Sequence, residues 1–273
     1  MAVSDVHVRY RAASLEKDVY PGRTATARTV DRLLGRPPTV SVRALGGVSF
    51  VARSGESIGV IGRNGSGKST LLRILAGLEP PSRGTVLAES TPVLLGVNPA
   101  LVPDLSGEQN VRLGLLAMGR SPAEVDRLLP DVVALAGLGK AIYLPMRTYS
   151  SGMGSRLRFA VAAAAEPRIL LIDEALATGD ASFRERSERR MDELRAQAGT
   201  VFLVSHAAQT VEETCTRAIW LEGGKVVADG PAAETARRYR VWTWRLAHGR
   251  QEEADAILAA TRATYAPPLV PVT

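Results

Sequence analysis

The sequence predicts an α/β fold with an antiparallel β layer and an inserted α-helical subdomain. Three observations lead to this prediction. A glycine-rich loop at 62–69 lies between an apolar strand pattern at 57–61 and a helical pattern at 70–76. A continuous apolar run at 168–173 is typical of a buried parallel strand. Between them, residues 107–165 carry apolar side chains at the i, i+3, i+4 spacing of helices.

The composition is that of an ordinary globular protein. The chain has 273 residues, of which 45% are apolar and 23% charged, enough for one large domain with or without an appendage. No run approaches the roughly 18 apolar residues of a bilayer-spanning helix, and the first residues do not have the pattern of a signal peptide. Cys215 is the only cysteine, which excludes an intrachain disulfide and fits a reducing cytoplasm.

The net charge is +6, and arginines far outnumber lysines among the 34 basic residues. A basic protein suits either nucleic acid or an anionic membrane face. The sequence has neither a basic groove interleaved with aromatic residues nor a recognition-helix motif. It therefore predicts no nucleic-acid partner and favours the membrane face.

The elements expected before the helical region are strands around one helix. Tyr10 is expected to end the first strand, and the polar, arginine- and threonine-rich stretch after it is interpreted as an extended loop or irregular insert. Gly77 and Pro80-Pro81 stop the helix that follows the glycine-rich loop. The expected strands are 3–10, 41–51, 57–61 and 85–88.

The elements expected later alternate between strands and helices. Ser121-Pro122 is a helix start, and Glu166-Pro167 ends the helical region. We expect a main domain at 1–233 with a helical subdomain at about 97–165, and a short C-terminal helical extension at 234–273. The expected later elements are strand 168–173, helix 182–196, strand 200–204, helix 209–215, a hairpin of 217–221 with 225–229, one or two helices after 232, and a loose end at 266–273.

The glycine-rich loop has the G-x-x-x-x-G-K-S pattern of a phosphate-binding loop. Its glycines let successive N–H groups converge on a diphosphate, and the start of the following helix adds positive charge. Lys68 can reach β- and γ-phosphate oxygens, and the Ser69 hydroxyl can ligate Mg²⁺. The sequence therefore predicts a bound nucleoside triphosphate. The residues expected to bind it are Gly62, Arg63, Asn64, Gly65, Ser66, Gly67, Lys68, Ser69 and Thr70.

Two adjacent carboxylates end the apolar strand at 168–173, where open α/β sheets gather their ligands. Asp173 would hold Mg²⁺ directly or through water, and Glu174 would orient or deprotonate the attacking water. The alternative is a pair of carboxylates on a solvated loop. His206 follows the strand at 200–204, within reach of a γ-phosphate or catalytic water, or is only a capping or surface residue. Tyr10 could stack on a base, or simply pack.

The stretch 149–156, YSSGMGSR, opens a helix with serine and glycine N–H groups. Such a helix start can bind a second anion. One molecule needs only one phosphate cradle, so a second would have to serve a neighbouring subunit. An ordinary helix cap is the alternative.

Together these motifs resemble the ATP-binding subunit of ABC transporters, over residues 3–240. The resemblance implies a P-loop NTPase (RecA-like) core, ATP and Mg²⁺ as cofactors, and a head-to-tail homodimer that sandwiches two nucleotides. Ser150, Ser151 and Gly152 stand at the signature that contacts the γ-phosphate bound by the opposite subunit. Asp180 stands in the D-loop, and His206 at the switch histidine. The implied catalytic residues are Lys68, Glu174 and His206.

Two departures from the commonest family motifs indicate which subfamily the chain resembles. YSSGM replaces L-S-G-G-Q, and DEALATGD replaces D-E-P, as in ATPases that export polysaccharides and teichoic acids. This implies ATP hydrolysis coupled to an integral-membrane permease of the ABC-2 type, a lipid-linked glycan as load, and a peripheral position on the cytoplasmic face of the membrane. No glutamine of the Q-loop type precedes Gln109, so 95–104 is assigned only as the expected permease contact.

Rival interpretations remain open from the sequence. The chain could be an exporter ATPase for another substrate, or a non-transport P-loop ATPase or kinase. A kinase would not need the signature helix, and a DNA-repair ATPase would need a coiled-coil insertion, of which there is no heptad pattern. In the tail, Tyr239, Trp242 and Trp244 could pack on the core, form a dimer contact or rest at a membrane surface.

Overall fold

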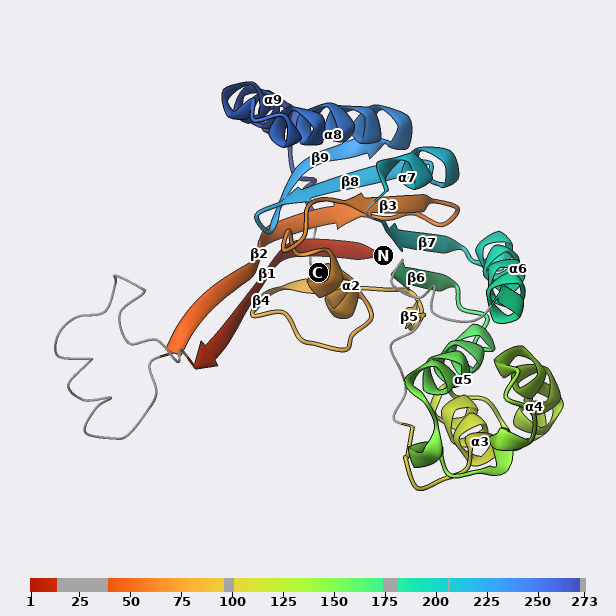
Figure 1. The fold of residues 1–273 in the computed structure, drawn as a ribbon. Coiled ribbons are helices and arrows are strands. Elements are labelled where there is room, and N and C mark those ends of the chain that lie inside the picture. The colour runs from red at the N-terminus through yellow and green to blue at the C-terminus, as the bar shows by residue number, and fades with distance from the viewer. Residues whose placement is uncertain (14–38, 96–100, 174–180, 206, 271–273) are drawn as a thin grey trace.

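The computed structural model describes residues 1–13, 39–95, 101–173, 181–205 and 207–270. All structural statements below refer to these residues. Two β-sheets lie against each other, a group of helices lies at one end, and two further helices lie over the opposite side of the larger sheet (Figure 1). Within the described part, no helix is both long and apolar enough to cross a bilayer.

The larger sheet has six strands in the order β5-β6-β7-β3-β8-β9, all parallel to their neighbours except β9. Its central strands β3, β6 and β7 are mostly apolar and largely buried, because both faces of the sheet are covered. The phosphate-binding loop follows β3, a central strand of this sheet. The strands are β3 (Ser57–Ile61), β5 (Val93–Leu94), β6 (Ile169–Asp173), β7 (Thr200–Val204), β8 (Arg217–Glu222) and β9 (Lys225–Pro231).

The smaller sheet confirms the predicted antiparallel layer. It consists of β1 (Ala2–Ala13), β2 (Thr39–Val51) and β4 (Arg83–Leu87) in the order β2-β1-β4. The prediction that Tyr10 ends the first strand is wrong, because β1 continues to pair with β2 as far as Ala13 opposite Thr39. The rest of the insert that was expected after Tyr10 lies mostly outside the described residues.

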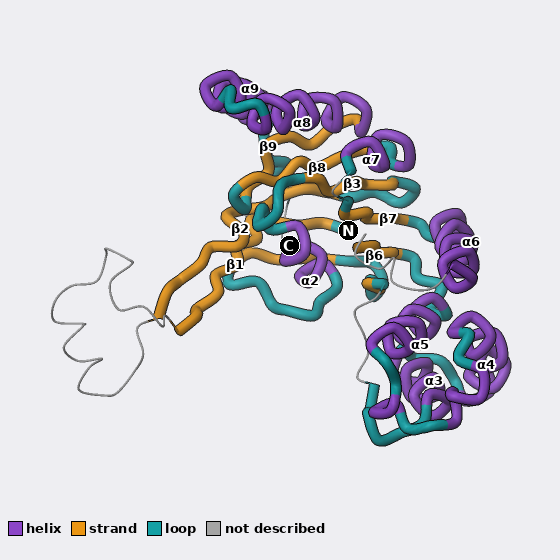
Figure 2. The backbone as a smooth tube through the Cα atoms, in the orientation of Figure 1, coloured by secondary structure: helices purple, strands orange, loops and turns teal. Residues whose placement is uncertain are grey.

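Helix α2 (Lys68–Leu75) lies in the layer between the two sheets (Figure 2). Its apolar side chains, among them Leu71, Leu72 and Leu75, are buried in one cluster with residues from β1, β2, β3 and β8. Removing this apolar surface from water fixes the helix, and with it the loop at its start, against both sheets. The phosphate-binding loop, including the buried Ser66, is therefore anchored by a helix that packs in the core.

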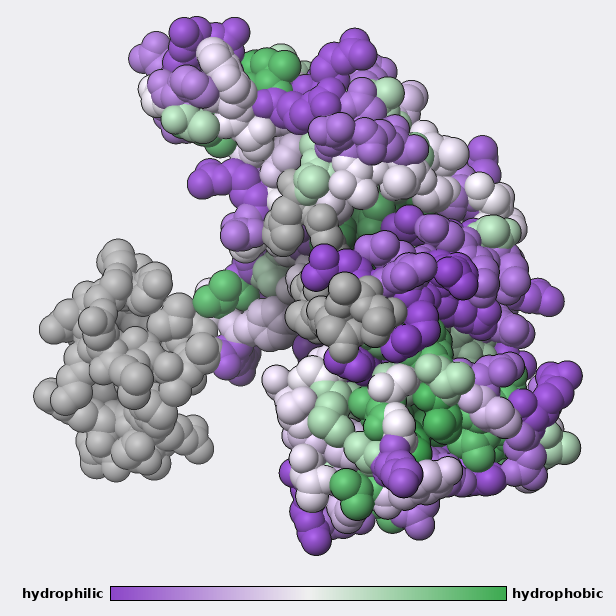
Figure 3. All heavy atoms as spheres, turned by 45° about the vertical axis from the view of Figure 1, so that its right-hand side comes forward, coloured by the Kyte–Doolittle hydropathy of each residue, from purple (hydrophilic) through white to green (hydrophobic). Residues whose placement is uncertain are grey.

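The helical subdomain has an apolar core of its own, formed by residues such as Val111, Leu115 and Leu157. Ser106 and Ser121 each form a capping box at a helix start, which satisfies free backbone N–H groups there. Figure 3 shows hydrophobic atoms gathered on this subdomain, below a largely hydrophilic face. Its helices are α3 (Gly107–Ala117), α4 (Pro122–Ala136), two short 3₁₀ helices (Gly139–Tyr143 and Met146–Thr148) and α5 (Ser151–Ala163), and α6 (Ala181–Gln197) packs beside it.

The last helices cover the other face of the large sheet. Helices α7 (Ala208–Thr214), α8 (Ala232–Ala247) and α9 (Gln251–Thr264) enclose an apolar cluster on β8. Trp242 packs on Trp220 with ring centroids 5.0 Å apart, and Tyr239 packs on both. Of the three possibilities for the tail aromatics, packing on the core is thus confirmed for Tyr239 and Trp242, whereas Trp244 is 46% exposed.

The chain is tied down at Tyr265, just before the segment 266–273 that was expected to be loose. The Tyr265 hydroxyl donates a hydrogen bond of 2.8 Å to the carbonyl oxygen of Ser49 in β2. Burial raises the pKa of Tyr265 to about 12, so the phenol stays protonated at neutral pH and keeps this bond. The segment after α9 is therefore tied to the small sheet at Tyr265, just before the proline-rich stretch.

Candidate nucleotide site

Close backbone approaches explain the glycines of the phosphate-binding loop. A Cβ on Gly67 would lie 2.6 Å from the carbonyl oxygen of Ala44, and the residue adopts a φ of +103°. A Cβ on Gly62 would collide with the carbonyl oxygen of Leu221 and the side chain of Ser66. The loop can therefore close over the start of α2 only without side chains at these two positions.

Lys68 is the first residue of α2 and is only 5% exposed. Its Nζ donates hydrogen bonds of 2.6 Å to the carbonyl oxygen of Gly62 and 3.0 Å to that of Arg63. Burial lowers the pKa of Lys68, while the negative charges of Asp173 and Glu222 act in the opposite direction. The ammonium group thus lies under the curve of the loop, where a phosphate group would be received.

The donors of this loop fit a polyphosphate. The Ser66 side chain is 2% exposed, and its Oγ has no hydrogen-bond partner within the described residues. The N-cap of α2 is Gly67, which has no side chain to cap the helix, so the first N–H groups of α2 are left for an anion. Arg63, Asn64, Gly65 and Ser69 are exposed around this position, and Thr70 is half-buried. ATP would be held here by the loop N–H groups and Lys68.

Asp173 ends β6 at the same edge of the sheet as the loop. The strands β6, β7 and β3 are parallel neighbours, so their carboxyl ends meet there. Asp173 pairs in register with Val204, the last residue of β7, and its charge acts on Lys68. Ser69 and Asp173 could together hold Mg²⁺, since hydroxyl and carboxylate oxygens are its preferred ligands. These metal-binding roles stay a prediction.

Three of the predicted site residues, Glu174, Asp180 and His206, lie outside the described residues. His206 directly follows Ser205, which comes after β7, and Glu174 directly follows Asp173. Their roles in hydrolysis remain predictions from the sequence.

Tyr10 lies beside the phosphate site rather than in the core. The ring is 40% exposed, and its hydroxyl donates a 2.6 Å hydrogen bond to Glu79, which also pairs with Arg73 of α2. Burial, followed by this bond to Glu79, raises the pKa of Tyr10, and the Thr70 side chain acts on the same hydroxyl. An exposed ring face next to the first turn of α2 suits a base that stacks on it, and this role also stays a prediction.

Ser150, Ser151 and Gly152 lie at the start of α5, in the helical subdomain. Ser150 is the N-cap, and its Oγ accepts a 3.2 Å hydrogen bond from the N–H of Met153. Within one chain these residues belong to a different part of the molecule from α2, which lies between the sheets (Figure 1). The ordinary cap is thus present, and a role at the γ-phosphate would come from a second copy.

Comparisons with known proteins identify the family that the sequence motifs resemble. A family model described as ABC transporter matches residues 45–177. The teichoic acids export ATP-binding protein TagH of Listeria monocytogenes is 36% identical over 240 residues, which cover 86% of this chain and 70% of that protein. The TagH protein of Staphylococcus epidermidis is 35% identical, and the match covers 84% of this chain and 87% of that protein. The chain belongs to the ABC transporter ATP-binding family.

Further relatives place it among ATP-binding proteins of polysaccharide exporters, as the motifs predicted. The O-antigen export system ATP-binding protein RfbB of Myxococcus xanthus is 38% identical, over 83% of this chain and 49% of that protein. The TagH protein of Bacillus anthracis is longer still, and the chain spans 36% of it. A solved structure described as an ATP binding subunit of an ABC transporter superposes with a TM-score of 0.63 at 26% identity, covering 87% of this chain and 92% of that one.

The fold of this ABC ATPase is also shared with more distant structures. A dimeric ATP-binding cassette in a post-hydrolysis state, bound to ADP and Pi, superposes with a TM-score of 0.61 at 21% identity, covering 85% of this chain and 98% of that one. At that identity the likeness concerns the fold alone. The predicted fold class, a P-loop core with an antiparallel layer and an inserted helical subdomain, is confirmed.

Sequence reasoning missed one residue of this site in the ABC ATPase. Glu222 ends β8, and burial raises the pKa of its carboxyl while the charges of Arg63, Lys68 and Arg262 oppose that effect. The sequence alone marked 222–224 as a hairpin turn. No local pattern could have placed Glu222 near the phosphate loop, because β8 is brought beside β3, the strand before that loop, by long-range strand pairing.

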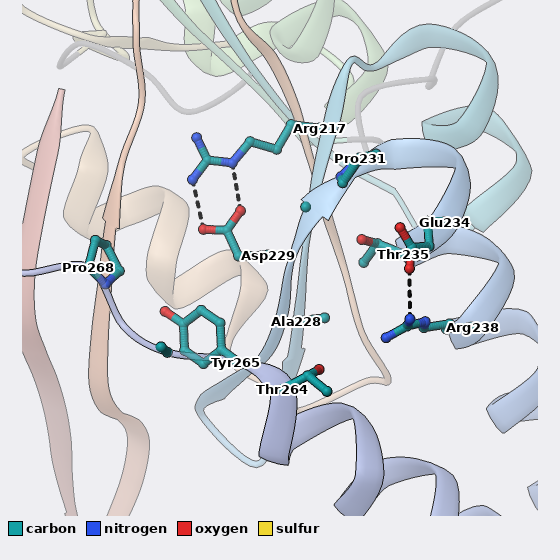
Figure 4. A pocket seen from close by; sticks show the side chains of 12 residues that line it. Arg217, Ala228, Asp229, Pro231, Glu234, Thr235, Arg238, Thr264, Tyr265 and Pro268 are labelled. Atoms are coloured by element: carbon teal, nitrogen blue, oxygen red, sulfur yellow. Dashed lines mark hydrogen bonds and ion pairs between the residues drawn. The ribbon is translucent and has the colours of Figure 1, made fainter.

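One hollow in the described part of the ABC ATPase lies away from the phosphate loop. It has a volume of about 550 Å³ and is bounded by β9, the start of α8 and the segment after α9 (Figure 4). Arg217 and Asp229 form a two-point ion pair on its wall at 2.6 and 2.7 Å, and Arg238 pairs with Glu234. Its charged groups are thus already engaged with one another, and the nucleotide chemistry belongs to the loop.

Proposed function

We propose that this ABC ATPase hydrolyses ATP to drive an exporter of a lipid-linked polysaccharide, of the O-antigen, galactan or teichoic-acid-like kind. The main support is the match to teichoic acids export ATP-binding proteins across most of the chain, with the phosphate loop and Asp173 in place. The names of the relatives describe their own substrates. The lipid-linked load is our inference for this chain.

In this proposal the chain's own residues position and activate the nucleotide. Lys68, the loop N–H groups and the start of α2 bind the triphosphate, and Tyr10 stacks on adenine. Mg²⁺, held by Ser69 and Asp173, would neutralise charge on the β- and γ-phosphate oxygens. Glu174 accepts a proton from the attacking water, and His206 orients the γ-phosphate or that water.

The proposed working form is a homodimer. Ser150, Ser151 and Gly152 of a second copy would meet the γ-phosphate with the N–H groups that begin α5, and Asp180 would lie in the loop between the two sites. Closing on ATP and opening after hydrolysis would then deliver work, because ATP contacts both copies only in the closed form.

The proposed partner is an integral-membrane permease of the ABC-2 type, and the ATPase would bind it peripherally at the cytoplasmic face. We assign the contact to residues near 95–104 and to the adjoining helical subdomain. This subdomain exposes apolar side chains, which suits a protein partner. The exposed side chains are Val102, Leu113, Leu116, Tyr143 and Leu144.

Replacing Glu174 tests the proposed hydrolysis. The Glu174→Gln variant should lose ATP turnover and keep ATP binding, because the amide cannot accept the proton from water. It should also accumulate ATP-dependent dimers, measured by light scattering. Glu213→Gln, an exposed carboxylate of α7, is the control and should behave like the wild type. Brisk hydrolysis by Glu174→Gln would refute the base assignment, and a strict monomer that phosphorylates an acceptor would point to a kinase.

The transported load needs a test in cells. Depleting the ATPase should cause a lipid-linked glycan to accumulate on the cytoplasmic side, and its chemical analysis identifies the load. The Glu174→Gln variant should not restore export, whereas Glu213→Gln should. Normal glycan export in depleted cells would contradict the proposed role.

A further inference from the structure

The segment between α2 and β4 is attached to β1 beside Tyr10. The N–H of Ser82 donates a 2.8 Å hydrogen bond to the carbonyl oxygen of His7, and the hydroxyl oxygen of Ser82 accepts one of 3.1 Å from the N–H of Arg9. The Tyr10 hydroxyl adds a third bond, of 2.6 Å, to the carboxylate of Glu79. Three contacts thus join this segment to the part of β1 that carries Tyr10.

Glu79 connects two elements with its two carboxylate oxygens. Its Oε2 accepts the bond from Tyr10 of β1, and its Oε1 pairs with the guanidinium of Arg73 in α2 at 2.7 Å. Arg73 comes three residues after Thr70 of the phosphate site, so both lie on the same face of the helix. The Glu79 side chain is 26% exposed, so the carboxylate is partly withdrawn from water. Glu79 therefore holds the Tyr10 hydroxyl against the helix that begins at the phosphate loop.

The bond to Glu79 leaves the ring of Tyr10 free to stack. It engages the hydroxyl at the tip of the side chain, and the residue is still 40% exposed. Burial, followed by this bond, raises the pKa of Tyr10, so the phenol stays protonated at neutral pH and remains the donor. A base that stacks on an anchored ring avoids the entropy cost of immobilising the side chain, which corresponds to about a two- to tenfold difference in affinity.

We propose that Glu79 is a positioning residue of the nucleotide site, which holds the ring of Tyr10 in place to stack on adenine. The inference deepens the proposed function, on which it rests, because it concerns the stacking assigned there to Tyr10. Glu79 acts through the Tyr10 hydroxyl and does not touch the nucleotide. Its effect is therefore confined to recognition of the base, and the phosphate groups remain the task of the loop and Lys68.

A purely structural role makes a different prediction. If the bond between Tyr10 and Glu79 served only to join β1 to α2, its loss would lower the melting temperature and weaken the binding of ADP and of inorganic pyrophosphate alike, or of neither. A positioning role instead changes the ratio of the two affinities, because pyrophosphate has no base. This ratio is the measurement that separates the two roles.

The test measures the Kd for ADP and for pyrophosphate in the full chain, by displacement of a fluorescent ADP analogue. ADP is chosen because it carries the base but is not hydrolysed. Tyr10→Ala removes the ring and should raise the Kd for ADP about tenfold, a usual value for stacking of one base. Glu79→Ala and Tyr10→Phe remove only the anchor, and each should raise it about threefold. All three should leave the Kd for pyrophosphate unchanged, whereas Lys68→Ala should weaken the binding of both.

Two matched controls remove similar contacts elsewhere. Glu212 of α7 is 24% exposed and pairs with Arg240 at 2.6 Å, which closely resembles the pair of Glu79 with Arg73. Tyr265→Phe removes a phenol hydrogen bond of 2.8 Å between the segment after α9 and β2. Glu212→Ala and Tyr265→Phe should leave the Kd for ADP unchanged, whatever they do to the melting temperature.

A double variant tests whether Glu79 acts through the Tyr10 hydroxyl. Once that hydroxyl is absent, loss of the carboxylate should have no further effect on ADP binding, since coupled groups are not additive. Tyr10→Phe/Glu79→Ala should therefore raise the Kd for ADP about threefold, like each single variant. An increase of about ninefold would show two independent effects and refute the proposed route.

The outcomes separate this inference from the proposed function. If Tyr10→Ala binds ADP more weakly but Glu79→Ala or Tyr10→Phe binds it as the wild type does, the positioning role alone is refuted. If Glu79→Ala does not fold, Tyr10→Phe decides in the same way. Unchanged ADP binding in Tyr10→Ala refutes the stacking and this inference together, and leaves the phosphate loop unaffected. A wild-type chain that binds neither ADP nor pyrophosphate refutes the ATPase proposal as well.

Discussion

At the scale of single residues, Lys68 concentrates the chemistry of the site. A lysine that is 5% exposed is unusual, because burial works against its charge. Two loop carbonyls receive its hydrogen bonds, and two carboxylates, Asp173 and Glu222, favour its protonated form. These contacts hold the Lys68 side chain in a position that suits a triphosphate.

Lys68→Ala should raise the Kd for ATP by about tenfold or more, because charge-assisted hydrogen bonds contribute roughly 1.5–3 kcal/mol each. Titration with a fluorescent ATP analogue measures the effect, and circular dichroism checks that the variant is folded. The exposed Lys225 of β9 gives the control Lys225→Ala, which should bind as the wild type does. Normal affinity in Lys68→Ala would contradict the assignment of the loop.

Residues of the site differ in how far the sequence could predict them. The glycines and Lys68 were predictable because their pattern is local, within one turn between a strand and a helix. Glu222 was not, because Arg63 and Arg262, whose charges act on its carboxyl, are distant from it and from each other in the sequence. A hairpin residue gives no local sign that it will lie beside a phosphate loop.

At the scale of elements, α8 shows how one helix presents two different faces. Trp242 is buried against Trp220 and Tyr239. Trp244, two residues later, stacks on His248 with centroids 4.2 Å apart and lies under Arg245 and Arg250 at the surface. Helical periodicity places residues two apart on different faces, so their contributions to stability should differ strongly.

Trp242→Ala should lower the free energy of unfolding by about 3–5 kcal/mol, since it removes a buried aromatic side chain and leaves a cavity. Trp244→Ala should cost about 1 kcal/mol or less, the range of exposed cation–π contacts. Urea unfolding followed by circular dichroism measures both, and Trp244→Ala serves as the matched control. Equal losses would contradict the packing of α8 on β8.

The elements themselves were largely predictable, since period-two and helical patterns report which faces are buried. The end of the chain was not. Tyr265 is followed by prolines that indicate a loop, yet its hydroxyl bonds to Ser49, 216 residues away. The local sequence predicts the backbone preference of such a segment. It cannot predict a single hydrogen bond to a residue far away in the sequence.

At the scale of the whole molecule, the phosphate loop and the start of α5 lie on different parts of one chain. Within the subdomain, the start of α5 cannot be distinguished from the start of α4 by its local geometry alone. Ser150 at α5 and Ser121 at α4 are both exposed N-caps with a side-chain hydrogen bond. Only the first is assigned to a site completed by a second copy.

Ser150→Ala and Ser121→Ala should each lower the free energy of unfolding by about 1 kcal/mol, the usual value of a helix cap. Only Ser150→Ala should also weaken the ATP-dependent dimer, which is best measured in the Glu174→Gln background by analytical ultracentrifugation. If both variants dimerise alike, Ser150 has no role beyond the cap.

The arrangement of the whole molecule was predicted in part. The antiparallel layer and the inserted helices followed from strand spacing and from the change to helical periodicity. The strand order β5-β6-β7-β3-β8-β9 did not, because it brings together strands separated by the entire helical subdomain. Sequence patterns indicate which faces of an element are buried. They do not indicate which strands become neighbours in the sheet, because that depends on the long connections between them.

The strand order also governs how the protein reaches its native state. The partners of β3 are β7 and β8, which both come much later in the sequence. The carbonyl oxygen of Ser57, for example, accepts a hydrogen bond from the hydroxyl of Thr216, 159 residues further along the chain. Pairing strands so distant in sequence requires closing long loops, which slows folding. During synthesis the apolar β3 therefore emerges long before its neighbours, exposed to aggregation. ATP that binds only the folded protein stabilises only that state. It therefore contributes to stability only after the strands on both sides of β3 have paired.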